Sequence, residues 1–153
     1  MRFILALLFV GIFFQTNAQD LKSYATTHYN VKSDLAIQGY DPVAYFTENK
    51  ALEGKEEITY NHQDVIYRFV SQKNKALFVE NPKKYEPEYG GYCAYAMADG
   101  DKVRVDPETF KVVDGRLFLF YNFRFTNTLK KWNTDEPNYL KNADQAWGKI
   151  ISN

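Results

Sequence analysis

The chain has 153 residues, and 19 Lys and Arg balance 19 Asp and Glu, so its formal net charge is zero. Without a basic excess to neutralise phosphates, this composition argues against a nucleic-acid partner. Aromatic residues make up 17% of the chain (12 Tyr, 12 Phe and 2 Trp), and such rings bury large areas in a core. The single cysteine, Cys93, excludes an internal disulfide.

The N-terminus has the pattern of a secretory signal. Residues 3–14 carry no charged side chain and follow Arg2, but they are too few for a membrane span, which needs about 20 residues. A polar stretch follows, with Ala18 placed for cleavage. We therefore expect residues 1–18 to be a cleaved signal peptide and the chain to be exported, either periplasmic or secreted. We expect no lipoprotein anchor because no cysteine lies at the cleavage point, and no later segment has the length of a membrane span.

The remaining chain reads as a lead-in and one domain. Polar and apolar residues alternate poorly over residues 19–35, which predicts an extended lead-in. Residues 36–150 predict a single domain without repeats or a linker. The first sharp feature of the domain is Asp41, which can cap a short helix with Pro42 at its first position, where the missing N–H costs nothing.

A hairpin and a helix are expected next. Residues 57–60 and 65–70 are β-branched and aromatic, and they flank four turn-forming residues, 61–64. Ser71 is a suitable N-cap for a helix that ends before Pro82.

The segment after Pro82 predicts a turn or a single helical turn over residues 83–89, because Pro82 and Pro87 both constrain it. Alanines favour a helix within residues 92–98, which the following glycine, Gly100, would end.

The C-terminal third contains the clearest hairpin of the chain. Residues 110–113 and 117–121 flank Asp114-Gly115, which supplies the positive φ angles of a tight turn. Residues 126–132 and 137–150 predict two helices, with Trp132 and Trp147 as their apolar anchors. The expected fold class is α+β: a compact single domain in which small antiparallel β-hairpins pack against several short helices.

Two sulfur side chains suggest a metal site. Cys93 and Met97 are four residues apart, so a helix would place both on one face. A thiolate and a thioether are soft ligands that suit Cu(I), and His62 on the first hairpin turn is the candidate third donor. Cysteine and methionine are also common core residues, so a purely structural role stays open.

Cys93 could also serve as a nucleophile. This use needs a nearby base, usually a histidine, and neither His28 nor His62 is its neighbour in sequence. The glycines before Cys93 place it near a helix N-terminus, which would lower the pKa of a thiol. The sequence does not decide whether the chain is an enzyme.

Several motifs in order resemble the YHS domain family, over roughly residues 36–147. The segments that carry the resemblance are residues 39–46, residues 67–71 with Asn74 and Phe78, Pro82, residues 85–87 and residues 90–94. The resemblance implies an exported domain of that family and an association with soft metals, copper above all.

The chain departs from the metal-binding members of that family at two places. They resemble Asp-Pro-Val-Cys-Gly-Met, whereas here Asp41-Pro42-Val43 is followed by Ala44-Tyr45-Phe46. Val70 and Asn74 stand where further thiol ligands are expected. The usual ligand set therefore does not carry over, and Cys93 remains as the candidate metal ligand, with copper as the candidate cofactor.

An alternative function uses aromatic residues instead of a metal. The chain would then be a non-catalytic module that binds a small ligand or partner in a concave aromatic pocket. The candidate residues of this site are Tyr40, Asp41, Tyr45, Tyr92 and Tyr95.

Overall fold

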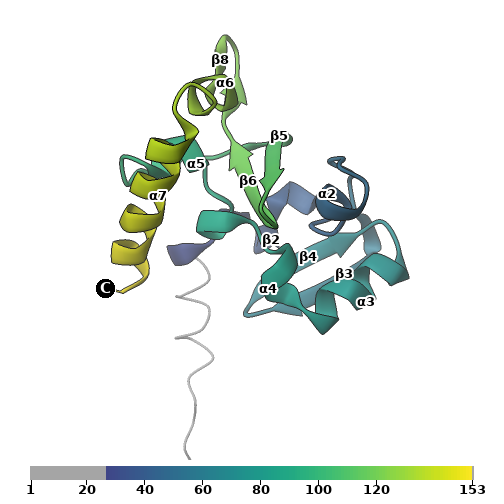
Figure 1. Ribbon diagram of the computed structural model, residues 1–153. Helices are drawn as coiled ribbons and strands as arrows, with labels where there is room; N and C mark the ends of the chain where they lie inside the picture. Colours follow the sequence, from purple (N-terminus) through teal and green to yellow (C-terminus); the bar gives the residue numbers. More distant parts are fainter. Residues whose placement is uncertain (1–26, 153) are drawn as a thin grey trace, which may run out of the picture.

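The structure is a computed structural model that describes residues 27–152 (Figure 1). The expected signal peptide and residues 19–26 of the lead-in lie outside the described residues. Residues 27–152 form an α+β domain in which a mixed four-stranded sheet and two hairpins pack against six α-helices. The predicted fold class is confirmed.

The four-stranded sheet has the strand order β1-β2-β4-β3. Its pairs are antiparallel except for β2 and β4, which run parallel with Leu35 opposite Ile66. Part of the expected lead-in therefore belongs to the sheet. The strands are β1 (Val31–Lys32), β2 (Leu35–Ala36), β3 (Lys55–His62) and β4 (Val65–Phe69).

The turn between β3 and β4 is tighter than the sequence predicts. Only Gln63 and Asp64 lie outside the strands, with φ angles of 52° and 62°. The Asp64 N–H donates to Asn61 Oδ1 over 3.1 Å. The expected four-residue turn is thus wrong, because two residues with positive φ close a hairpin whose twist matches its strands.

The helices largely follow their predicted positions. Ser71 accepts a hydrogen bond from the Asn74 N–H, as expected of an N-cap. No helix among residues 27–152 has the length and apolar character needed to cross a membrane. The helices are α2 (Ala44–Thr47), α3 (Gln72–Glu80), α4 (Pro82–Tyr85), α5 (Ala94–Met97), α6 (Thr128–Trp132) and α7 (Glu136–Ile151), with 3-10 turns η1 (Ile37–Gly39) and η2 (Glu88–Gly91).

Two further hairpins complete the domain. Strands β5 (Asp106–Val113) and β6 (Arg116–Phe120) are joined by Asp114 and Gly115, whose φ angles of 51° and 73° confirm the predicted tight turn. The short hairpin of β7 (Asn122–Phe123) and β8 (Thr126–Asn127) was not predicted as a pair of strands.

Strand β6 separates two hydrophobic cores. Leu117 and Leu119 face a core built on the four-stranded sheet, whereas Phe118 and Phe120 face a second core that contains α5, α6 and α7. This division follows from the alternation of side chains along a strand. Burying each of these side chains is worth roughly 2 kcal/mol. In Figure 1 the β5–β6 hairpin accordingly stands between the sheet and α7.

The Asp41 carboxylate connects three parts of the domain by hydrogen bonds: the start of α2, the end of β4 and α3. Its buried carboxylate accepts hydrogen bonds from the N–H groups of Val43 and Ala44 at the start of α2. The other oxygen accepts from the Val70 N–H after β4 and from Asn74 Nδ2 in α3, both at 2.8 Å. The predicted cap is wrong in its position: α2 has Val43 as its N-cap and begins at Ala44, so Pro42 is not its first residue. Asp41 instead accepts from the N–H groups that lead into the helix.

The substitution Asp41→Ala should therefore destabilise the domain strongly. It leaves three backbone donors and one amide buried without an acceptor, which costs about 3 to 5 kcal/mol in the free energy of unfolding. Urea denaturation at neutral pH measures this loss. Asp101→Ala, at an exposed position, is the matched control and should change the free energy by no more than about 0.5 kcal/mol. A loss below about 1 kcal/mol for Asp41→Ala would contradict the structural role.

Candidate functional site

Cys93 is fully buried at the start of α5. Its Sγ lies 3.3 Å from Thr128 Oγ1 and 3.4 Å from the backbone nitrogen of Tyr121. Its own N–H donates to the carbonyl of Val103. Neither polar neighbour of the sulfur supplies the base that a nucleophilic cysteine needs. The thiol is a packed core group in this arrangement.

Met97 does not share the surroundings of Cys93, although it is only four residues away. Cys93 caps α5 with a ψ of 117°, outside the helical range, so the spacing rule for a helix face does not apply to it. Cys93 joins the first core and pairs with Leu119 of β6, whereas Met97 joins the second core with Trp132.

His62 lies at the end of β3, in a third environment. Its ring stacks on Tyr60 and meets Phe78 edge-on at 6.1 Å, and its Nε2 lies 3.8 Å from Glu86 Oε1. Among residues 27–152, no group of three or more His, Cys, Asp or Glu side chains is placed to hold a metal ion. Copper binding by Cys93, Met97 and His62 stays a prediction without a shared site to support it.

The aromatic site predicted as the alternative separates into two parts. Tyr45 is buried beside Asp41, and its hydroxyl donates to the carbonyl of Pro107 over 3.0 Å. Burial raises the pKa of Tyr45 far above its ordinary value. Tyr40 is partly exposed and donates to Glu108 Oε1 over 3.2 Å. Because Asp41 and Tyr45 are enclosed, these residues support the fold and offer little surface to a ligand.

Tyr92 and Tyr95 lie around α5 and contact different parts of the chain. The Tyr92 hydroxyl donates to the carbonyl of Tyr29 over 3.2 Å. The Tyr95 ring packs against Tyr139 of α7 at 4.9 Å, and Lys131 Nζ lies 5.6 Å from its centroid. Both rings are therefore engaged in holding neighbouring segments in place.

An aromatic hollow of about 260 Å³ lies elsewhere, between η2 and the C-terminal end of α7. We call it the η2–α7 pocket. It contains four rings together with charged side chains from the α4–η2 region. Its lining residues are His28, Tyr29, Lys83, Glu86, Pro87, Glu88, Tyr89, Gly90, Trp147 and Ile151.

One wall of this pocket arises from a mismatch in strand pairing. The chain runs parallel to β6 and pairs with it at Pro87 and at Cys93, opposite Leu117 and Leu119. Six residues thus span the distance that two residues of β6 cover. The excess chain bulges outward as η2, where Tyr89, Gly90 and Gly91 have φ angles of 56°, 61° and 81°.

Gly90 allows three segments to meet at the pocket. A Cβ atom there would overlap the carbonyl oxygen of His28 and lie 3.2 Å from Trp147 Cη2. The Gly90 carbonyl accepts the Asn30 N–H over 2.8 Å, which fixes the N-terminal segment against η2. The Trp147 ring meets the rings of His28 and Tyr89 edge-on, at 6.4 and 6.3 Å. A side chain at position 90 would therefore displace the pocket wall.

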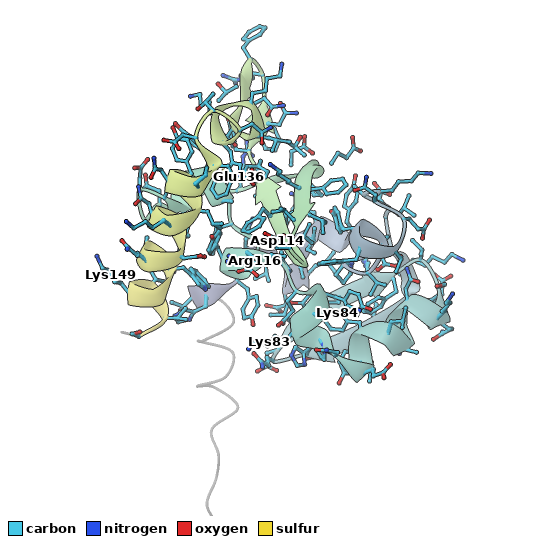
Figure 2. All side chains as sticks on the ribbon, in the orientation of Figure 1. Lys83, Lys84, Asp114, Arg116, Glu136 and Lys149 are labelled. Carbon is cyan, nitrogen blue, oxygen red and sulfur yellow. The ribbon has the colours of Figure 1, made fainter. Side chains whose placement is uncertain are left out.

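A charged network holds the two sides of the pocket together. Arg116 donates to Glu88 Oε2 over 2.8 Å and to Asp144 Oδ1 over 2.6 Å, and the Tyr89 hydroxyl donates to the same Asp144 oxygen over 2.8 Å. Figure 2 shows Arg116 beside Asp114, between α7 and α4. The network links β6, η2 and α7, which are far apart in the sequence.

The pKa shifts of this network follow from its contacts. Hydrogen bonds to Glu88 and Asp144 raise the pKa of Arg116, so the guanidinium stays charged. Partial burial opposes ionisation of Asp144, but the hydrogen bonds from Arg116 and Tyr89 outweigh it and lower its pKa. Burial, followed by the bond to Asp144, raises the pKa of Tyr89. Arg116 and Asp144 are thus ionised around neutral pH, with Tyr89 as a neutral donor.

The pocket lining carries a small negative charge. Its carboxylates are Glu86 and Glu88, and its one ammonium group is Lys83, which gives a formal charge of −1. Beyond the lining, Arg116 and Asp144 compensate one another. Aromatic faces beside excess negative charge favour a cationic ligand.

Sequence reasoning missed this pocket. The sequence predicts Trp147 as a helix anchor and Glu86 only as part of a family motif, and no local pattern singles out Glu88 or Tyr29. The available signal was the Gly90-Gly91 pair, which follows two prolines and marks a close approach of backbones. Which segments approach one another there depends on contacts that the sequence alone does not reveal.

Comparisons with known proteins add no further constraint. No family model matches the chain, and neither the curated proteins nor the solved structures contain a match.

The burial of Cys93 predicts a low reactivity of its thiol. A disulfide reagent such as DTNB should leave the folded domain essentially unmodified and should react fully once the chain is unfolded in guanidinium, because the exposed fraction of Cys93 is 0%. The unfolded chain is the control for reagent and pH. Reaction of the native domain at the rate of an ordinary free thiol would contradict the buried placement of Cys93 and make it a candidate reactive thiol again.

Proposed function

We propose that this chain is an exported, non-catalytic binding protein that holds a small organic cation in the η2–α7 pocket. The observation that carries the proposal is the combination of partly exposed and buried rings with a net negative lining in one hollow of about 260 Å³. Concave, aromatic-lined hollows with a few convergent polar groups are the usual form of a small-ligand site.

The rings supply the attraction for a cation. Trp147 is partly exposed in the pocket, and its indole has the strongest cation–π interaction among aromatic side chains. Such a contact contributes about 0.5 to 2 kcal/mol, depending on how well the cation is desolvated. Tyr89 fixes one edge of the indole, so the ring is held in position before a ligand arrives.

The carboxylates supply the polar contacts. Glu86 is held by the Tyr67 hydroxyl, which donates to its Oε1 over 3.2 Å, and Glu88 is held by Arg116. Each carboxylate has two oxygens and can accept further hydrogen bonds from an ammonium group. Because both are already fixed, less side-chain entropy is lost when the ligand binds.

The cellular setting in this proposal comes from the sequence. Export rests on the signal pattern of residues 1–18, and kinship with the YHS domain family rests on the motifs of residues 36–147. The copper association of that family would require Cys93, which the first core encloses. A cation-binding pocket uses none of the predicted metal ligands, so it stands independently of that association.

Isothermal titration of the chain from Gln19 onward with tetramethylammonium and n-butylammonium tests the proposal. We expect saturable binding by the wild type. Trp147→Leu keeps apolar volume but removes the ring, and it should weaken binding by about twofold to thirtyfold. Trp147→Phe keeps a ring and should retain most of the affinity.

The matched charge variants are Glu86→Gln in the pocket and Glu80→Gln, which is exposed on α3. Only the first should weaken binding. Absence of binding by the wild type, or equal affinity in the wild type and Trp147→Leu, would refute a cation site at this pocket.

A further inference from the structure

The β7–β8 hairpin carries the most exposed large apolar side chain of residues 27–152. The exposed fraction of Phe125 is 105% of the reference value, against 43% for Val79 and 45% for Ile151. Single exposed apolar residues are common on protein surfaces. This one is unusual because the whole ring is in solvent at the apex of a two-residue turn.

The turn itself is built at a conformational cost. Arg124 precedes Phe125 and has a φ of 55°, in the left-handed region that favours glycine. One arginine and one phenylalanine therefore occupy a turn in which small residues are usual. Strained backbone at an exposed tip is a reason to look for a function there.

The hairpin is rigidly attached to the domain. Phe123 packs against Tyr121 at 4.9 Å, and the guanidinium of Arg104 lies 4.3 Å from the Phe123 ring. The Asn122 side chain donates to Thr109 Oγ1, and buried Thr128 donates to the carbonyl of Tyr121. The tip is thus presented in a fixed position, which lowers the entropic cost of binding through it.

The region around the hairpin is basic, although the whole chain is neutral. Between Asp114 and Asp135 the sequence contains four cations and no acidic residue: Arg116, Arg124, Lys130 and Lys131. All but Arg116 are exposed, and α6, which carries the two lysines, follows β8 directly. Arg104 adds a further exposed cation beside Phe123.

Nearby acidic groups are already engaged. Asp106, at the start of β5, accepts hydrogen bonds from the Glu108 N–H and from the Thr109 hydroxyl. Glu136, at the start of α7, binds Lys111 over 2.6 Å. An apolar tip with cations around it therefore faces solvent, and its charge complements an anionic surface.

We propose that the β7–β8 hairpin is a membrane-docking tip, which inserts Phe125 among the headgroups of an anionic phospholipid surface while Arg124 and Lys130 contact the phosphates. Aromatic rings inserted at the interface and flanking cations together produce reversible binding of this kind. This proposal is independent of the ligand in the η2–α7 pocket.

The position of the tip gives the bound protein an orientation. In Figure 1 the hairpin stands at one end of the molecule, and the C-terminal end of α7, which borders the pocket, lies at the other. A domain docked by its hairpin thus holds the η2–α7 pocket away from the lipid surface, open to the aqueous compartment.

Co-sedimentation with vesicles tests the proposal. The chain from Gln19 onward, which keeps every described residue, is mixed at low salt with vesicles of equimolar phosphatidylglycerol and phosphatidylcholine, or of phosphatidylcholine alone. We expect binding to the anionic vesicles only. Phe125→Ala should lower the partition coefficient about tenfold or more, and Phe125→Leu should restore part of it. Lys130→Gln should lower it about fivefold.

Val79→Ala and Lys73→Gln, both exposed on α3, are the matched controls and should leave partitioning unchanged. All variants begin at Gln19, so a difference in sedimentation between them results from the substituted side chain. Thermal melting checks that each variant is folded. Phe125→Ala should leave the melting temperature unchanged, because the Phe125 ring is fully exposed. Equal sedimentation of Phe125→Ala and wild type, or no preference for anionic vesicles, would overturn the proposal.

Discussion

Strand β6 is the element on which the rest of the structure depends. Its alternating Leu and Phe side chains complete two separate cores, so the sheet on one side and helices α5 to α7 on the other are held by the same four consecutive residues. Arg116 at its first position then joins η2 to α7. Because the segment from Pro87 to Cys93 follows β6 with excess length, the bulge that forms the pocket wall is a consequence of the same strand.

This arrangement places the two predicted sulfur ligands in different cores. Sequence spacing places Cys93 and Met97 on one helix face, but Cys93 lies at the cap, where it pairs with Leu119 and enters the first core. Met97 enters the second core, on the other face of β6. A rule for helix interiors does not hold at a helix end, and a four-residue spacing is informative only when both residues have helical backbone angles.

Local signals made much of the fold predictable. The Asp114-Gly115 turn and the Ser71 cap each depend on neighbours within four residues, and the structure contains both. Asp41 binds the Val43 N–H as a local signal suggests, but the helix begins later than predicted. The parallel pairing of Leu35 with Ile66 and the approach of His28 to Gly90 join residues far apart in the chain. No local pattern encodes such contacts, so the sheet order and the pocket were beyond sequence reasoning.

The central claim is that ligand binding occurs at Trp147 and not at Cys93. The two indole N–H resonances in a ¹H–¹⁵N spectrum test it directly, because Trp147 lines the pocket whereas Trp132 is buried in the second core. On titration with n-butylammonium, the account predicts that the Trp147 resonance shifts with saturation while that of Trp132 stays in place. A stationary Trp147 resonance, together with shifts around Cys93 and Met97 on addition of Cu(I), would contradict it.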